Sequence, residues 1–273
     1  MTVADAVREA AQRLSVTSDT ARLDAELLMA HALGTTRSDL LMRHMREPAP
    51  ASFAALVERR SANEPVAHIL GRQEFFGLDF AITEDTLIPR GDSETIVQAA
   101  LDSAGPDARV LDMGTGSGAL LLAFLSERPA AKGIGIDISP TALAVAQGNS
   151  EALGLANRAE FRVASWLDDG WTDDLGKFDL ILCNPPYVED DAELDPDVRN
   201  FEPASALFAG PEGLDDYRVV IPQLCKLLSP EGIAVLEIGW KQAGAVSEIA
   251  SESGFQTELR QDLAGRPRVL ILR

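Results

Sequence analysis

The chain has 273 residues, 46% of them hydrophobic, so it can form two domains or one large domain around an ordinary buried core. Its 24 Lys and Arg against 43 Asp and Glu give a formal charge of −19, which argues against a basic surface that binds nucleic acid. The charge fits either a basic protein partner or an acidic surface that only keeps the protein soluble. The two cysteines and three histidines form neither a disulfide framework nor a metal site, and no signal peptide or membrane span is evident, so we expect a cytoplasmic protein without membrane contact or metal. We also expect the protein to be a monomer.

Residues 1–63 have the pattern of a small helical domain. Apolar residues recur at helical spacing over Val3–Leu14, and Thr2 with Asp5 can cap this first helix. A second helix is expected to begin at Asp19 or Thr20 and to end at Gly34. A third helix is predicted to begin near Ser38, and a fourth at Ala51.

Residues 64–90 change character and are predicted to form a hairpin-like linker. The short stretches Glu74–Phe76 and Asp79–Thr83 are rich in aromatic and β-branched residues, and glycines and prolines punctuate them.

Residues 91–273 alternate between apolar strands and helices, a pattern typical of an α/β fold with a mostly parallel sheet covered by helices on both faces. The strands are predicted at Arg109–Met113, Gly133–Asp137, Ala159–Val163, Phe178–Cys183 and Ile233–Ile238. The helices between them are predicted at Gly118–Glu127, Pro140–Leu153, Leu214–Leu228 and Gln242–Ser253. An antiparallel edge hairpin of Phe255–Leu259 and Arg268–Leu272 closes the domain.

A glycine-rich turn follows the first of these strands, in the sequence Asp112-Met-Gly114-Thr115-Gly116-Ser117-Gly118. Glycines let the backbone turn tightly from strand to helix and let a ligand approach it closely. A glycine-rich turn alone also occurs in nicotinamide enzymes. The spacing here, with an acid two residues before the first glycine, resembles the first motif of class I methyltransferases.

Two further positions are candidates for the same ligand. Asp137 ends the next strand, where a carboxylate can accept hydrogen bonds from both ribose hydroxyls of an adenosine, with a second helix cap or a surface charge as the alternative. Ser139 and Pro140 fit the start of the following helix. Trp166 follows the third strand and either borders an adenine or is a partly buried core residue.

The most specific motif is Asn184-Pro185-Pro186-Tyr187, directly after the fourth strand. It resembles the motif of methyltransferases that modify nitrogen conjugated to a π-system. An amide nitrogen is a poor nucleophile, and the Asn184 side-chain carbonyl and Pro185 main-chain carbonyl can orient its two N–H groups. The prolines stiffen the turn, and Tyr187 can pack against the flat amide.

Over nearly its whole length the chain resembles the HemK/PrmC family, the N5-glutamine methyltransferases of peptide chain release factors. The resemblance rests on the motifs above together with 65–71, 75–77, 87–90, 202–207, 213–218, 237–242 and 262–266. It implies a helical substrate-recognition domain (1–63), a hairpin linker (64–90) and a seven-stranded, Rossmann-like class I methyltransferase domain (91–273). It also implies that the glutamine of a Gly-Gly-Gln motif in release factors is methylated.

The resemblance assigns roles to individual residues. S-adenosyl-L-methionine, with S-adenosyl-L-homocysteine as product, is expected to bind at Gly114, Thr115, Gly116, Ser117, Gly118, Asp137, Ile138, Trp166 and Asn184. The substrate glutamine is expected at Asn184, Pro185, Pro186 and Tyr187, with Asn184 and Pro185 acting in catalysis.

The chain departs from the family pattern at two positions: Gly91 replaces a proline, and Ser165 replaces an aspartate before Trp166. Arg90 is expected either to face the substrate or to form a salt bridge inside the linker.

Three other functions remain open at this point. The motifs also fit an enzyme that methylates a glutamine of a large-subunit ribosomal protein. A nucleic-acid exocyclic-amine methyltransferase would use the same turn but would have to flip out a base, and the acidic charge disfavours it. A non-enzymatic nucleotide-binding module is disfavoured by the intact Asn184–Tyr187 motif.

Overall fold

The computed structural model describes all of residues 1–273, which divide into two compact units. One unit consists of Met1–Arg72 with Leu194–Phe201, and the other of Gln73–Glu193 with Glu202–Arg273. The helical unit therefore extends past residue 63 and takes in a short segment that the sequence pattern placed in the second domain. None of the helices is both long and apolar enough to cross a membrane.

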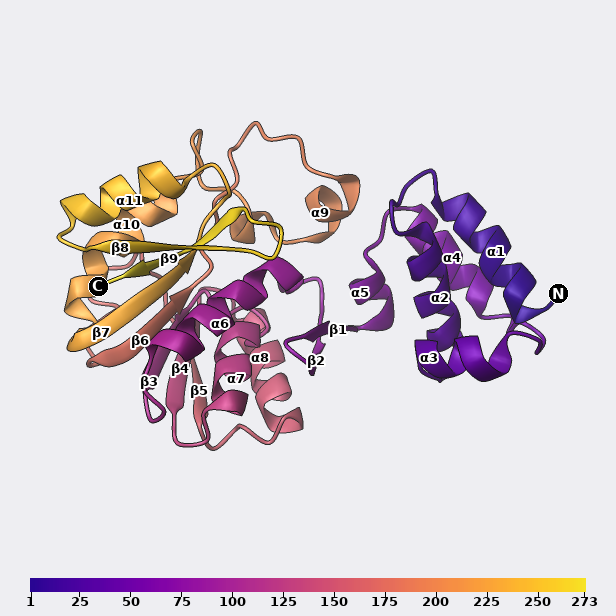
Figure 1. The fold of residues 1–273 in the computed structure, drawn as a ribbon, viewed down its shortest axis with the longest axis horizontal. Helices are drawn as coiled ribbons and strands as arrows, with labels where there is room; N and C mark the ends of the chain where they lie inside the picture. The colour runs from indigo at the N-terminus through magenta and orange to yellow at the C-terminus, as the bar shows by residue number, and fades with distance from the viewer. The chain divides into compact units, whose positions relative to one another are not determined.

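The helical unit contains the four helices predicted from the sequence and two short ones that were not predicted (Figure 1). Thr2 caps α1 by accepting a hydrogen bond from the Asp5 backbone N–H, and the predicted apolar positions of this helix are all buried. The helices are α1 (Val3–Leu14), α2 (Ala21–Ala32), α3 (Arg37–Asp39) with a π-helical turn over Leu40–His44, α4 (Phe53–Ser61), α5 (Val66–Leu70) and α9 (Pro196–Phe201).

A buried ion pair holds the helical unit together beside its apolar core. The Arg60 guanidinium donates to Asp24 at 2.8 Å, and both side chains are 6% exposed. The hydroxyls of Ser18 and Thr20 also donate to Asp24. Arg60 lies 3.6 Å from Asp197, so the same guanidinium helps to hold α9 in this unit.

The predicted hairpin is present as β1 (Arg72–Phe75) and β2 (Leu78–Ala81). Phe76 and Gly77 turn the chain with φ of 54° and 74°, and the N–H of Phe76 donates to Glu94. The Asn149 side chain accepts from the N–H of Ala81 and donates to the carbonyls of Ala81 and Ser117. This one buried amide ties β2 to the glycine-rich turn.

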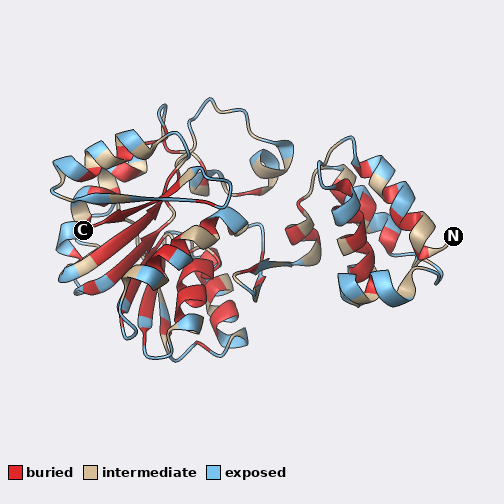
Figure 2. Ribbon diagram, in the orientation of Figure 1, coloured by how far each residue is buried: buried red, intermediate tan, exposed pale blue.

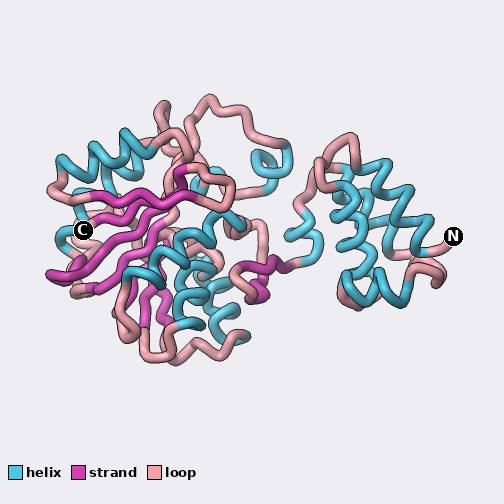
Figure 3. The backbone as a smooth tube through the Cα atoms, in the orientation of Figure 1, coloured by secondary structure: helices cyan, strands magenta, loops and turns pink.

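The second unit is the predicted mostly parallel sheet of seven strands, in the order β5-β4-β3-β6-β7-β9-β8. Figure 1 labels these strands, and Figure 3 draws them in magenta. The strands are β3 (Arg109–Met113), β4 (Lys132–Asp137), β5 (Ala159–Val163), β6 (Phe178–Cys183), β7 (Leu228–Glu237), β8 (Thr257–Gln261) and β9 (Pro267–Leu272). β5, β4, β3, β6 and β7 are parallel neighbours, and β9 pairs antiparallel with both β7 and β8.

Helices cover both faces of this sheet, with α6, α7 and α8 on one face and α10 and α11 on the other (Figure 1). They are α6 (Glu94–Ser103), α7 (Ala119–Glu127), α8 (Pro140–Ala152), α10 (Asp215–Gln223) and α11 (Ala243–Glu252). The central strands are buried on both faces, as their continuous apolar sequences require (Figure 2). α10 is shorter than predicted and passes into a 3-10 turn over Leu224–Lys226, and β7 begins at Leu228.

Candidate active site

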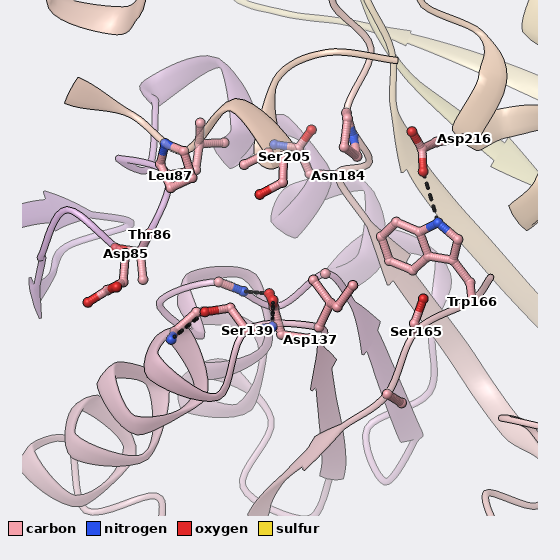
Figure 4. Close-up of a pocket in the computed structure, with 18 of the residues that line it drawn as sticks. Asp85, Thr86, Leu87, Asp137, Ser139, Ser165, Trp166, Asn184, Ser205 and Asp216 are labelled. Atoms are coloured by element: carbon pink, nitrogen blue, oxygen red, sulfur yellow. Dashed lines mark hydrogen bonds between the residues drawn. The ribbon is translucent and has the colours of Figure 1, made fainter. Parts of the chain in front are cut away.

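The carboxyl ends of β3, β4, β5 and β6 open into one cavity of about 290 Å³ (Figure 4). Ligands bind at this edge in open parallel sheets. Of the predicted site residues, those that line the cavity are Gly114, Gly116, Asp137, Ile138, Trp166, Asn184 and Pro186. The predicted residues that do not line it are Thr115, Ser117, Gly118, Pro185 and Tyr187.

The glycine-rich turn needs its glycines for conformation and for packing. Gly114, Gly116 and Gly118 have φ of 71°, 53° and 82°, a region that L side chains rarely adopt. A Cβ on Gly118 would lie 3.2 Å from the Cβ of Ala146 in α8, so this glycine serves the contact between the turn and a helix. Gly114 and Gly116 present their backbone to the cavity instead.

A buried carboxyl braces the turn from below. Asp112 is fully buried, and the Thr115 hydroxyl donates to it at 2.5 Å. Burial raises the pKa of Asp112 to about 7, against the opposing effect of the Thr115 hydrogen bond. Thr115 thus points into the protein, which explains why it does not line the cavity.

Asp137 is held at the end of β4 by two backbone groups. Its Oδ2 accepts from the N–H of Gly116 and its Oδ1 from the N–H of Ser139, both at 2.9 Å. Each oxygen keeps a further lone pair, so this carboxylate can still accept hydrogen bonds from a ligand. The Ser139 hydroxyl accepts from the N–H of Ala142, so the predicted helix cap at Ser139 and Pro140 is confirmed.

Trp166 is both a wall of the cavity and part of the core packing. Its ring covers Gly114, where an added Cβ would lie 3.2 Å from the indole. The indole N–H donates to Asp216 Oδ1 at 2.8 Å (Figure 4). Asp216, on α10, also lines the cavity, and no sequence pattern points to it, because an acid at the start of a helix is usually a capping residue.

The Asn184–Tyr187 turn leaves the buried strand β6 and places Asn184 and Pro186 on the cavity wall. Tyr187 points away to a buried carboxyl: its hydroxyl donates to Glu237 at 3.0 Å. Its main-chain carbonyl accepts from the Gln242 side chain at 3.0 Å. Burial raises the pKa of both the Tyr187 phenol and the Glu237 carboxyl, so each remains protonated to a higher pH than usual. The predicted packing of Tyr187 against a substrate amide stays a prediction.

Arg90 forms an ion pair, but its partner lies outside the linker. Its guanidinium donates to Glu202 at 3.1 Å, and Glu202 also accepts from the N–H of Ile88. The expected salt bridge inside the linker is therefore wrong in its partner, because Glu202 follows α9 in the chain. Gly91 begins a single 3-10 turn over Gly91–Ser93.

Comparison with known proteins supports the assignment of both units. The PrmC N-terminal domain family matches residues 5–71, and a methyltransferase domain family matches residues 104–262. A release factor glutamine methyltransferase from Cereibacter sphaeroides is 42% identical, covering 100% of this chain and 99% of that protein. One from Rhodospirillum rubrum is 43% identical, covering 92% of this chain and 78% of that protein.

The chain belongs to the release factor glutamine methyltransferase family. The predicted family and enzyme class, a methyltransferase, are thereby confirmed. A solved methyltransferase from Pyrococcus furiosus shares the fold with a TM-score of 0.54 at 16% identity, covering 81% of this chain and 98% of that one.

Replacing Asp137 with alanine should weaken binding of S-adenosyl-L-methionine, because the variant removes a carboxylate that faces the cavity. Hydrogen bonds to a charged group contribute on the order of 2 kcal/mol, which corresponds to roughly thirtyfold in Kd. Isothermal titration calorimetry measures the change directly. Asp168→Ala, on an exposed position outside the cavity, is the matched control, and unchanged affinity in Asp137→Ala would contradict the ribose assignment.

Proposed function

We propose that the protein transfers a methyl group from S-adenosyl-L-methionine to the side-chain amide nitrogen, N5, of the glutamine in the Gly-Gly-Gln motif of peptide chain release factors. S-adenosyl-L-homocysteine is the other product, and no metal takes part. The observation that carries this proposal is that Asn184, at the nitrogen-binding turn, faces the same cavity as Asp137 and the backbone of Gly114 and Gly116. Donor and acceptor can therefore meet in one cavity.

The cavity suits an adenosine-containing cation. Gly114 and Gly116 present no side chain toward the ligand, and Asp137 retains lone pairs for the two ribose hydroxyls. The exposed apolar side chain of Ile138 and the ring of Trp166 offer flat or apolar contacts for a base. Residues that line the cavity include Asp85, Asp137 and Asp216 but no lysine, arginine or histidine, so the walls favour a positively charged ligand.

The proposed chemistry is in-line transfer to an amide nitrogen. When bound, S-adenosyl-L-methionine supplies a methyl group that is electrophilic because it is carried by a sulfonium. The carbonyl oxygens of Asn184 and Pro185 accept hydrogen bonds from the two amide N–H groups, which aims the nitrogen lone pair toward the methyl carbon. Positioning of this kind can supply much of the rate. The methylated amide then loses a proton to water, so a strong general base is not needed.

The surroundings of the turn support its role as a rigid acceptor. The Pro185 and Pro186 side chains are buried, and proline fixes φ. Beyond them, Tyr187 is held at its hydroxyl by Glu237 and at its carbonyl by Gln242. Asn184 is thus fixed between a buried strand and a tethered tyrosine, which limits the conformations open to its side chain.

Release factors are favoured as the substrate because the curated relatives are named release factor glutamine methyltransferases, and their similarity to this chain extends over both units. A ribosomal-protein glutamine would use the same chemistry and is the alternative. An exocyclic amine of a nucleic acid is disfavoured by the charge of −19 and by the acidic cavity walls. A substrate that acts in translation would also place this protein in the cytoplasm.

The substrate assignment is tested by incubating the enzyme and radiolabelled S-adenosyl-L-methionine with unmethylated release factor, large-subunit ribosomal proteins and ribosomal RNA in parallel. We expect label in the release factor and none in the other two. A release factor whose Gly-Gly-Gln glutamine is replaced by alanine is the matched control and should take up no label. Label in ribosomal protein or RNA alone would overturn the assignment.

Asn184→Ala should lower the rate of methyl transfer by on the order of a thousandfold, because the amide loses an oriented acceptor in the reacting geometry. Binding of S-adenosyl-L-methionine should change little, since the other residues of the donor site remain. Single-turnover transfer and calorimetry separate the two effects. Asn157→Ala, an exposed position outside the cavity, should behave as the unmodified enzyme, and a normal transfer rate in Asn184→Ala would refute the acceptor role.

A further inference from the structure

Asp216 differs from the other two acids of the cavity in how its oxygens are used. Asp137 accepts a backbone N–H on each oxygen. Asp85 accepts the hydroxyl of Thr141 on Oδ1 and that of Thr83 on Oδ2. Asp216 accepts the Trp166 indole N–H on Oδ1, and no hydrogen bond reaches its Oδ2. One oxygen of a half-buried carboxylate at the cavity is therefore free to accept a hydrogen bond from a ligand.

The surroundings make this carboxylate costly to keep charged. Burial raises the pKa of Asp216, the Trp166 hydrogen bond opposes that effect, and the neighbouring Asp215 adds a second negative charge. Arg218, two residues further along α10, pairs with Asp215 and Glu212 and leaves Asp216 without a cation. A positively charged ligand group would supply the missing partner.

The position of Asp216 selects which ligand group that is. The sulfonium joins the ribose, the methyl group and the amino-acid chain, so with the ribose at Asp137 and the methyl group presented to Asn184, the amino-acid end begins on the Asn184 side of the cavity. Figure 4 shows Asn184 and Asp216 on one wall, drawn above Asp137. The donor carries two positive groups, a sulfonium without hydrogen atoms to donate and an α-ammonium with three N–H donors. Of these two positive groups, only the ammonium can donate a hydrogen bond to Asp216 Oδ2, and it also supplies the opposite charge.

We propose that Asp216 is the receptor for the α-ammonium group of the methyl donor, which it binds through Oδ2 while Oδ1 holds the Trp166 indole over Gly114. The inference rests on the proposed function, since it assumes that the cavity binds S-adenosyl-L-methionine. It gives Asp216 a role in selectivity: the site recognises the intact amino-acid end of the donor and discriminates against adenosine thioethers that lack this end.

The test compares two ligands in isothermal titration calorimetry of the full-length protein. S-adenosyl-L-homocysteine carries the ammonium and the carboxylate but no sulfonium, whereas 5′-methylthioadenosine carries none of the three. Asp216→Asn keeps one oxygen that can accept the Trp166 N–H, and it replaces the charged Oδ2 with an NH2 group that cannot accept a hydrogen bond. We expect this variant to weaken binding of S-adenosyl-L-homocysteine by about tenfold or more and to leave the affinity for 5′-methylthioadenosine unchanged.

The sign of this result is informative. Removal of a negative charge would by itself strengthen binding of the ligand carboxylate, so weaker binding has to come from the ammonium. Asp168→Asn makes the same charge change on an exposed position outside the cavity and should leave both ligands unaffected.

Two outcomes would overturn the inference. If Asp216→Asn weakens binding of both ligands equally, the residue acts by holding Trp166 or by binding the adenosine that both ligands share. If it weakens neither, Oδ2 has no ligand contact. Both outcomes leave the proposed function standing, provided that the unmodified protein binds S-adenosyl-L-homocysteine. Failure of the unmodified protein to bind either ligand would instead reject the donor site, and this inference with it.

Discussion

Neighbouring parallel strands end at the same edge of a sheet, and the site depends on this constraint. β5, β4, β3 and β6 lie side by side, so the residues that follow them meet although they are far apart in the chain. The strand ends bring Gly114, Asp137, Trp166 and Asn184 to one cavity. Because an amide nitrogen reacts only when it is aimed at the methyl carbon, this convergence is the physical basis of the proposed transfer.

Buried polar groups then hold the turns that follow these strands in place. Asp112 braces the glycine-rich turn through Thr115, and Glu237 holds the hydroxyl of Tyr187. Burial raises the pKa of both carboxyls, which shows that these positions are unfavourable for a charge. Polar groups in such surroundings destabilise a fold unless they are paired, and here each of them fastens a turn that borders the cavity. The fold thus uses paired, buried polar groups at the places where geometry matters for the ligand.

Patterns local in the sequence predicted most of the fold and the outline of the site. The strand alternation, the helix cap at Ser139 and the edge hairpin depend on neighbouring residues and are confirmed. Contacts between distant segments could not be predicted in this way. Nothing near Trp166 indicates that its N–H reaches Asp216 on α10, nor does the motif at Tyr187 reveal its bond to Glu237. The place of Leu194–Phe201 in the helical unit likewise depends on a tertiary ion pair of Asp197 with Arg60.

The central claim is that the methyl group arrives on an amide nitrogen of glutamine, and the most direct measurement locates it chemically. A release factor treated with the enzyme is digested, the Gly-Gly-Gln peptide is fragmented by tandem mass spectrometry, and the same peptide is hydrolysed in acid. The extra methylene mass should lie on the glutamine, and hydrolysis should release methylamine and leave glutamate. A methyl group on another residue, or a methylated glutamine that yields no methylamine, would contradict the proposed chemistry.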